Sequence, residues 1–506
     1  LYPLFKKDIE SGKLTYQQAA ETLGCMWVKF NEAQSFHGFY FAKEAAGSLL
    51  QQITIGGTDK DGKDATNDVS YLILEVSRQM AIPQPGLYVR WHNTIDHNFM
   101  IKAIETNRDT GGGVPAFIND QAGTRNFLGL GVPLEDAGEW TAAGCLSYCL
   151  SKVNTVVRMP LYVNIPKVFE IALNNGYDPR TGIKAGPQTG EAVKFTSIDQ
   201  LENAFWEQFS YFIDKGMNDL YIGFLAKGDF LCAPVSTAYL EDSIKTGKDA
   251  MEEGGRYPQL NLCIGQRGFV DVANSLAAIR KVVFEDKKVT MPRLLEALKA
   301  DWVGYDDVLK LCMQAPKYGN DDDYVDEIHD RLSLKSGEII AAKKDPVNGL
   351  TWKVARPALT GHYYLGEVVG ALPNGRKAGT PLYDAALSPG AGTDVNGPTS
   401  AIKSATKVNH FKPDMDSLVM NMKFSSTILK DRSSIEQFIS MMRTFFNRGG
   451  WHIQFNILNK DDLIQAKAHP EQWKHLIVRV AGYSAYFVEL PPAIQDEIIA
   501  RTEHSL

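Results

Sequence analysis

One glycine and one short cysteine-containing segment have the most distinctive chemistry in this sequence. Gly482 stands within the largely apolar residues 478–487, and Cys145 and Cys149 lie close together in a segment rich in small residues. Removal of a hydrogen atom from a glycine α-carbon leaves a centre that can become planar and delocalise into both neighbouring peptide groups, because no Cβ resists the change. A glycine in a tight turn would explain the same stretch. Gly482 is therefore a candidate radical centre, and other segments have to decide between the two explanations.

The stretch around Gly482 resembles the radical motif of the glycyl radical enzymes, the superfamily that contains pyruvate formate-lyase. Three further parts of the chain resemble segments of that family, namely residues 371–379 with the Gly- and Pro-rich region that follows, residues 451–456 and residues 495–502. The resemblance extends from about residue 70 to the end of the chain, and the motifs occur in the order that the family has. It implies that Gly482 carries a stable backbone radical.

The resemblance also implies a catalytic cysteine, because a radical on the backbone needs a movable group that holds it beside the substrate. Gly144-Cys145 lies where the family has this cysteine, so Cys145 is the candidate thiyl residue and Cys149 is its rival. A buried free cysteine is more often a small apolar side chain than a reagent. We expect that ordinary role for the other four cysteines, which are Cys25, Cys232, Cys263 and Cys312.

The residues after Cys145 bear on the reaction. Dehydratases, choline and isethionate lyases and arylacetate decarboxylases of this family typically have Gly-Cys-x-Glu, in which the carboxylate moves protons, whereas this chain has Ser147 at the Glu position. Pyruvate formate-lyase has two adjacent cysteines, and here Leu146 follows Cys145. The segment is more similar to the cysteine loop of alkylsuccinate and benzylsuccinate synthases.

We therefore expect a reaction that adds a hydrocarbon C–H, from an n-alkane or a methylarene such as toluene, across fumarate to give a substituted succinate. The Gly482 radical and the Cys145 thiyl would carry this reaction, which needs no general base beside the thiyl. The alternative is a glycyl radical lyase, decarboxylase or dehydratase that acts on a small polar substrate and has its proton-transfer group elsewhere.

Fumarate has two carboxylates, so its pocket needs Arg side chains or backbone donors in bidentate geometry. Arg158 follows the cysteine segment closely and is the nearest candidate, although a surface salt bridge or a structural role would explain it equally well. A hydrocarbon forms no hydrogen bonds, so the rest of the pocket has to be apolar and closed to water.

The resemblance implies a partner and a modification in place of a bound cofactor. The radical at Gly482 would be installed by a separate activating enzyme that uses S-adenosylmethionine and a [4Fe-4S] cluster, and we expect this chain itself to bind no cofactor or metal. Hydrocarbon-adding members also have small accessory subunits, so we expect a homo- or hetero-oligomer. A non-enzymatic hypothesis is that the chain is a catalytically silent subunit that keeps the fold for assembly. Such a subunit would have no physical reason to retain Gly482 and Cys145.

The elements that must position these residues alternate between strand and helix, which favours an α/β fold. Strands are expected at residues 87–91 and 114–118, helices up to about residue 80 and around 95–105, a loop between 137 and 162, and mainly helices from 163 to 350, including one over 236–253. The resemblance implies the ten-stranded β/α barrel of the glycyl radical enzymes with helices outside. It divides the chain into residues 1–370, a barrel domain with the cysteine loop near 144–149, and residues 371–506, a C-terminal glycine radical domain.

Length and composition agree with a folded enzyme. The chain has 506 residues, 44% of them hydrophobic and 22% charged, and it is long enough for a large core. The net charge of −7 without a basic cluster argues against nucleic-acid binding, and no apolar stretch is long enough to span a membrane. Few and scattered cysteines favour the cytoplasm. Because the chain begins at Leu1, inside what reads as a helix, we expect an N-terminal part of the barrel to be missing.

Overall fold

A computed structural model gives the structure of the chain, and it describes residues 1–33, 50–144, 147–153, 158–250, 255–345, 349–356, 358, 360–408, 415–416 and 418–505. The chain forms two compact units. The first comprises Leu1–Leu150, Ala358–Thr360 and Ser417–Leu506, and the second comprises Ser151–Pro357 and Gly361–Asp416. The division at residue 370 that the family resemblance implies stays a prediction.

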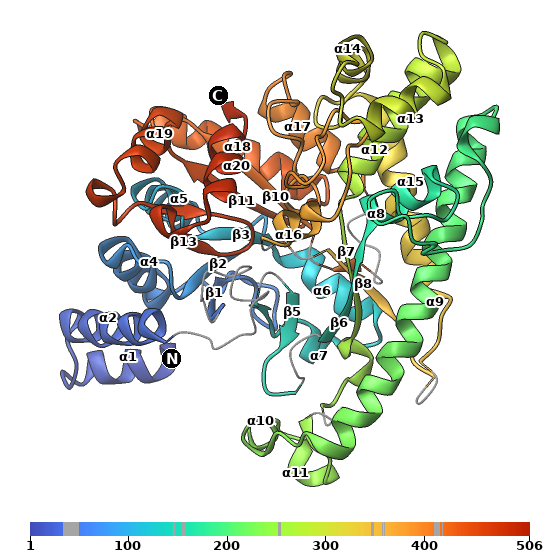
Figure 1. Cartoon of the computed structure of the whole chain (residues 1–506). Coiled ribbons are helices and arrows are strands. Elements are labelled where there is room, and N and C mark those ends of the chain that lie inside the picture. Colours follow the sequence, from blue (N-terminus) through green and yellow to red (C-terminus); the bar gives the residue numbers. More distant parts are fainter. Residues whose placement is uncertain are drawn as a thin grey trace. The chain divides into compact units, whose positions relative to one another are not determined.

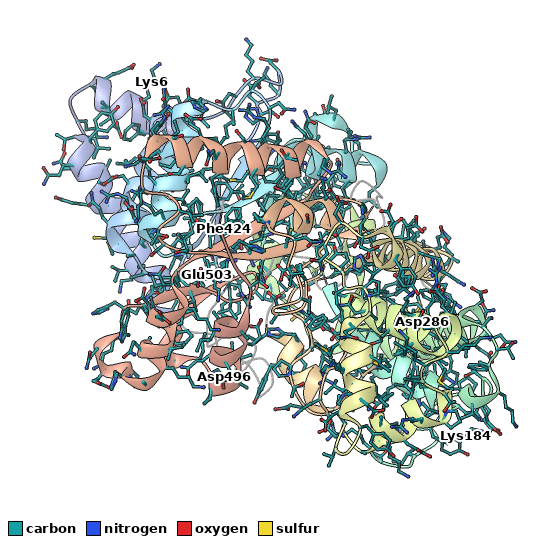
Figure 2. All side chains as sticks on the ribbon, turned by 90° about the horizontal axis from the view of Figure 1, so that it is seen from above. Lys6, Lys184, Asp286, Phe424, Asp496 and Glu503 are labelled. Atoms are coloured by element: carbon teal, nitrogen blue, oxygen red, sulfur yellow. The ribbon has the colours of Figure 1, made fainter. Side chains whose placement is uncertain are left out.

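The first unit is built on a six-stranded sheet with the order β1-β2-β3-β11-β10-β14. Its strands are β1 (Gln52–Gly56), β2 (Gly86–Trp91), β3 (Ala116–Asn119), β11 (His452–Ile457), β10 (Val419–Phe424) and β14 (Glu503–His504). Neighbouring strands are parallel except for β3 and β11, which are antiparallel. Figure 2 labels Phe424 of β10 and Glu503 of β14, which come from the two strands at one edge of this sheet. Segments from both ends of the sequence therefore share one sheet.

The two faces of this sheet differ in chemistry because side chains alternate along each strand. In β11, Ile453 and Phe455 point to one face, and this face packs against α18 (Arg432–Asn447), where Phe438 lies 4.7 Å from Phe455 between ring centroids. The opposite face of β11 has His452, Gln454 and Asn456, and all six residues of the strand are buried. A buried polar face needs hydrogen-bond partners, and two hairpins supply most of them.

These hairpins and the helices complete the first unit. One hairpin consists of β4 (Trp140–Ala143) and β5 (Ser147–Leu150), and the other of β12 (Ile477–Arg479) and β13 (Ser484–Tyr486). The helices are α1 (Tyr2–Glu10), α2 (Tyr16–Glu32), α4 (Asp68–Met80), α5 (His97–Asp109), α6 (Asp120–Gly129), α7 (Leu134–Ala137), α18, α19 (Lys460–Ala468) and α20 (Pro492–Ala500). Figure 1 shows α1 and α2 side by side next to α4, as the contacts between these helices require.

The second unit has a four-stranded parallel sheet with the order β6-β7-β8-β9. The strands are β6 (Arg158–Asn164), β7 (Leu262–Arg267), β8 (Lys353–Ala355) and β9 (Met415–Asp416). The helices are α8 (Ile165–Leu173), α9 (Ile198–Phe230), α10 (Pro234–Ala238), α11 (Ser243–Thr246), α12 (Phe269–Ile279), α13 (Met291–Lys299), α14 (Asp306–Gln314), α15 (Asp323–Ala341), α16 (Gly361–Glu367) and α17 (Pro398–Ala405). In Figure 1, α9 is the long green helix.

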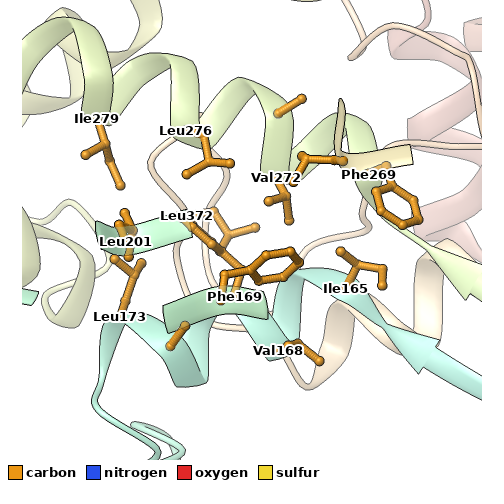
Figure 3. Packing of buried hydrophobic residues seen from close by; sticks show 14 of the residues in the cluster. Ile165, Val168, Phe169, Leu173, Leu201, Phe269, Val272, Leu276, Ile279 and Leu372 are labelled. Carbon is orange, nitrogen blue, oxygen red and sulfur yellow. The ribbon is translucent and has the colours of Figure 1, made fainter. Parts of the chain in front are cut away.

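The core of the second unit is apolar and lies where α8, α9 and α12 meet. Figure 3 shows Phe169 of α8 between Leu201 of α9 and Val272 of α12, with Leu372 from the following loop region filling the space beside them. None of these four side chains is exposed. Complete burial of a large apolar side chain stabilises a fold by roughly 1.5–3 kcal/mol, so this cluster fixes the helices on their sheet.

The structure confirms much of the element prediction and corrects three parts of it. Strands β2 and β3 and helices α4 and α5 match the expected ranges. The expected helix over 236–253 is wrong, because the described part of that range holds only the short helices α10 and α11. The expected loop over 137–162 contains strands β4, β5 and β6, and the first 80 residues include the strand β1. Within the described residues, none of the helices combines the length and the hydropathy that a membrane span requires.

Candidate radical site

Gly482 lies in the bend that joins β12 to β13. The Val480 amide donates to the Tyr483 carbonyl at 2.9 Å across this bend, and Gly482 has φ of +84°. Glycine adopts this left-handed region without the strain that a Cβ causes. Gly482 is buried, and Ala481 and Tyr483 beside it are at most 1% exposed. The turn explanation thus accounts for the backbone conformation, and burial gives the same residue the shielding from solvent that a radical would need.

Side chains from the polar face of the sheet hold this bend by its backbone. Asn456 of β11 accepts a hydrogen bond from the Arg479 amide at 2.8 Å and donates to the Arg479 carbonyl at 2.7 Å. Asn421 of β10 donates to the Val480 carbonyl at 3.4 Å, and Arg501 donates to the same oxygen at 2.8 Å. These bonds satisfy backbone groups that would otherwise be buried without partners. The polar residues of β10 and β11 therefore determine where Gly482 lies.

Tyr88 of β2 is the described side chain that bonds to Gly482 itself. Its hydroxyl donates to the Gly482 carbonyl at 3.0 Å and accepts from Arg479 Nη2 at 2.7 Å. Arg479 also donates through Nε to Gln454 at 2.6 Å and through Nη1 to Ser484 at 3.2 Å. The fork-shaped guanidinium thereby fixes the Tyr88 ring, the start of the bend and strand β13 at once.

Strands β4 and β5, which flank Cys145 in the sequence, form the other hairpin, and the polar face of the same sheet bonds to Trp140, Ala142 and Gly144. Arg90 Nη1 donates to the Trp140 carbonyl at 2.8 Å, and the Ala142 amide donates to Thr54 Oγ1 at 3.0 Å. The Gly144 carbonyl accepts from Gln52 Nε2 at 2.6 Å. Gly144 begins the turn with φ of +55°. These contacts fix the backbone of the residue that directly precedes Cys145.

The two hairpins meet the sheet at neighbouring positions. Thr54 pairs with Tyr88, and Gln52 pairs with Gly86, so all four residues point to the same face of β1 and β2. Gly86 has no side chain, and a Cβ there would lie 2.0 Å from Gln52 Oε1, which shows that the Gln52 amide crosses over this position. Adjacent strands are about 4.8 Å apart, and alternate residues of a strand are about 7 Å apart. Gln52 and Tyr88, which anchor the Gly144 and Gly482 carbonyls, are therefore one strand and two residues apart, a diagonal of roughly 8 Å.

Two titratable groups on this face are buried. Burial and the positive charge of Arg479 lower the pKa of His452 well below its usual value, and its ring packs edge-on against Tyr88 with 5.7 Å between centroids. Burial lowers the pKa of Lys423 to about 8, and this amine donates to the Ile499 carbonyl at 3.0 Å. Across the described residues, no group of three His, Cys, Asp or Glu side chains is arranged to hold a metal ion. The polar face thus has the character of a scaffold for two loops.

The three site residues expected from the sequence have different outcomes. The structure describes Gly482 in the bend given above, whereas Cys145 lies outside the described residues together with Leu146. Arg158 is the first residue of β6 in the second unit, and its side chain is outside the described part. The roles of all three residues stay predictions. Cys149, the rival thiol, is half-buried on β5, where its sulfur lies 3.3 Å from Thr141 Oγ1.

The sequence reasoning missed the residues that hold the two loops, namely Gln52, Thr54, Tyr88, Asn421 and Gln454. A signal for one of these, Gln454, was available. Polar residues at every second position in residues 452–456, flanked by apolar ones, indicate a strand with one polar face. For Gln52 and Thr54 the sequence offers no comparable pattern.

Comparison with known proteins agrees with this geometry. The pyruvate formate lyase-like family model matches residues 1–355, and the glycine radical model matches residues 384–488. Trans-4-hydroxy-L-proline dehydratase from Clostridioides difficile is 37% identical over 511 residues, which cover 100% of this chain and 63% of the relative. Isethionate sulfite-lyase from Desulfovibrio desulfuricans is 35% identical over 100% of this chain, and the match covers 61% of that relative. The chain belongs to the pyruvate formate lyase-like family and carries a glycine radical domain.

Solved structures give the same result for the fold. The crystal structure of hydroxyproline dehydratase from C. difficile with its substrate bound matches with a TM-score of 0.94 and 35% identity, over 100% of this chain and 63% of the other. The α/β fold of the glycyl radical enzymes, expected from the resemblance, is thereby confirmed. The chain spans about three fifths of the length of the curated relatives named above. These relatives are a dehydratase and a sulfite-lyase, so the comparisons do not support the expected synthase of the benzylsuccinate type.

Proposed function

We propose that the protein is a glycyl radical lyase or dehydratase that acts on a small polar substrate. The observation that carries the proposal is the bend at Gly482, which is buried and held by the sheet through its backbone, and whose anchor Tyr88 lies on the strand next to the Gln52 that holds the Gly144 carbonyl. The relatives act on hydroxyproline and isethionate, as their names state, and they favour a polar substrate over a hydrocarbon.

In this proposal Gly482 stores the radical, and Cys145 relays it to the substrate. An activating enzyme with S-adenosylmethionine and an iron–sulfur cluster removes one hydrogen atom from the Gly482 α-carbon. The Gly482 radical then takes the hydrogen atom of the Cys145 thiol, and the thiyl takes a hydrogen atom from a substrate carbon. The neighbouring hydroxyl then leaves as water after it receives a proton, or the neighbouring sulfonate leaves as sulfite while the substrate hydroxyl loses a proton, and the product radical takes a hydrogen atom back from Cys145.

A leaving hydroxyl needs a proton, and the position two residues after Cys145 holds Ser147 in place of an acid. Serine is a poor proton donor compared with a carboxylic acid. A dehydratase with this sequence must take the proton for the leaving hydroxyl from another group, and a sulfite-lyase with this sequence must pass the proton of the substrate hydroxyl to another group. Both reactions therefore need a proton-transfer group other than the residue at position 147.

Fumarate addition is the second candidate, because the same Cys145-Leu146-Ser147 segment lacks the Glu that dehydratases of this family typically have. In this reaction the hydrogen atom that the thiyl takes from the hydrocarbon passes through the thiol to the product radical, so no acid or base is needed beside the thiyl. The proposed roles of Gly482 and Cys145 are the same in both candidates, so only the product distinguishes them.

The test is a product analysis under anaerobic conditions with protein made from its complete reading frame and activated by its radical-SAM enzyme. Separate reactions contain trans-4-hydroxy-L-proline, isethionate, glycerol, 1,2-propanediol, or fumarate together with toluene or n-hexane, and mass spectrometry identifies the products. Turnover of a polar substrate, lost in Gly482→Ala and Cys145→Ser and retained in Cys149→Ser, supports the proposal. A substituted succinate would replace it with fumarate addition.

A further inference from the structure

The carbonyl of Gly482 receives a hydrogen bond from a phenol that is itself bonded by a buried cation. Tyr88 is fully buried, and its hydroxyl lies 3.0 Å from the Gly482 oxygen and 2.7 Å from Arg479 Nη2. Because Arg479 has only donors, the hydroxyl accepts from the guanidinium, and its own proton points to the carbonyl. The three groups form a directed chain from Arg479 through Tyr88 to Gly482.

The charge of Arg479 is not compensated by an ion pair within the described part of the chain. Its side chain is 1% exposed, and the described partners of its guanidinium are the neutral groups of Gln454, Ser484 and Tyr88. Hydrogen bonds to a charged donor are stronger than neutral ones, and the low dielectric of the interior increases the effect. An uncompensated guanidinium therefore polarises the Tyr88 O–H and makes it a better donor to Gly482.

The sheet leaves a space for this chain of groups. Tyr88 pairs with Ala116 of β3, and the register of β3 with β11 brings Gln454 next in the same row. The Arg479 guanidinium bonds to both Gln454 and Tyr88, so it crosses β3 at Ala116, whose side chain is a single methyl group. A larger residue at position 116 would occupy the place of the guanidinium, so the small side chain is part of the arrangement.

This arrangement acts on the atoms over which a glycyl radical is delocalised. In such a radical the unpaired electron is shared between the α-carbon and both adjacent peptide groups, and one contributing form places negative charge on the carbonyl oxygen. A strong donor to that oxygen stabilises this form and draws spin density away from the α-carbon. We propose that Tyr88 is a radical-stabilising hydrogen-bond donor to Gly482 and that Arg479 is the positioning residue that orients and polarises it. The inference deepens the proposed function and rests on it.

The α-proton of a glycyl radical splits its electron paramagnetic resonance signal into a doublet, and the splitting measures the spin density on the α-carbon. In Tyr88→Phe the donor is absent, so the splitting increases and the radical decays about tenfold faster, as expected for the loss of one buried hydrogen bond. Site-specific 3-fluorotyrosine at position 88 is a stronger donor of nearly the same shape, so the splitting decreases below that of the unmodified protein. Tyr318→Phe removes the hydroxyl of an equally buried tyrosine in the second unit and leaves the signal unchanged.

The outcomes separate this inference from the function on which it rests. An activated wild-type protein without a doublet refutes the proposed function and the role of Tyr88 together. A wild-type doublet whose splitting and decay are identical in Tyr88→Phe and in the fluorotyrosine protein overturns the inference alone. If Tyr88→Phe melts early or holds no measurable radical, the fluorotyrosine protein decides, because a decreased splitting supports the inference and an unchanged one refutes it.

Discussion

Replacement of Asn456 by Ala tests most strongly whether the sheet positions Gly482. The Asn456 side chain accepts a hydrogen bond from the Arg479 amide at 2.8 Å and donates one to the Arg479 carbonyl at 2.7 Å. In Asn456→Ala the Arg479 amide loses its described side-chain partner, and the carbonyl keeps only the weaker bond from Arg501 at 3.3 Å. A buried group left without a partner costs about 1–3 kcal/mol, so we expect a local cost of about 3 kcal/mol. This corresponds to an approximately hundredfold increase in opening of the hairpin.

The measurement is hydrogen–deuterium exchange of the peptide that covers residues 477–487, since exchange reports local opening of backbone hydrogen bonds. Asn119→Ala is the matched control, because Asn119 is also buried and donates to two backbone carbonyls, those of Phe446 at 3.1 Å and Gly450 at 2.9 Å. The control is expected to lower the melting temperature without faster exchange in 477–487. Equal exchange of this peptide in Asn456→Ala and in the control would show that Asn456 does not hold the Gly482 hairpin.

Three further predictions concern the same face of the sheet. Replacement of Gln52 by Ala removes the 2.6 Å bond to the Gly144 carbonyl, so exchange in residues 140–150 increases about tenfold while 477–487 is unaffected. In Gly86→Ala the new Cβ displaces the Gln52 amide, and the same peptide exchanges faster although Gln52 is retained; unchanged exchange would show that Gln52 does not hold the loop. Burial lowers the pKa of Lys423 from 10.5 to about 8. Between these two pH values the Lys423 amine is therefore protonated in the unfolded chain and neutral in the folded chain. The unfolding free energy of the wild type therefore rises with pH in this window, and Lys423→Met abolishes that part of the rise in chemical denaturation curves.

The sequence allowed prediction of the family and the fold class better than of the residues that surround Gly482. The residues around Gly482 and the alternation of strands and helices indicate the family and the fold class, because both are local patterns. Tyr88 lies 394 residues from Gly482, and nothing local distinguishes its hydroxyl from that of any other strand tyrosine. Its role follows from the pairing of β2 with β3 and of β3 with β11, which only the folded sheet establishes.

The expected reaction shows a different limit. Ser147 in place of Glu is a local difference, and it led to the prediction of fumarate addition, whereas the similarity over the whole chain favours lyases and dehydratases. A single position beside the cysteine cannot define the substrate, because a proton donor from another strand can replace it. The expected loop over 137–162 was wrong for a related reason. Small residues and glycine break the helical period, and they also suit a hairpin whose backbone lies close to a sheet, as in β4 and β5.

The site at which oxygen cleaves the activated protein tests most directly whether Gly482 carries the radical. Protein made from its complete reading frame is activated without oxygen, exposed to air and analysed by mass spectrometry, with Gly482→Ala treated in parallel. A radical at Gly482 reacts with oxygen, and the chain is cut there, so we expect a C-terminal fragment that begins at the Gly482 position and is missing in Gly482→Ala. An activated protein that stays intact, or that is cut elsewhere, would contradict the assignment of Gly482 as the radical residue.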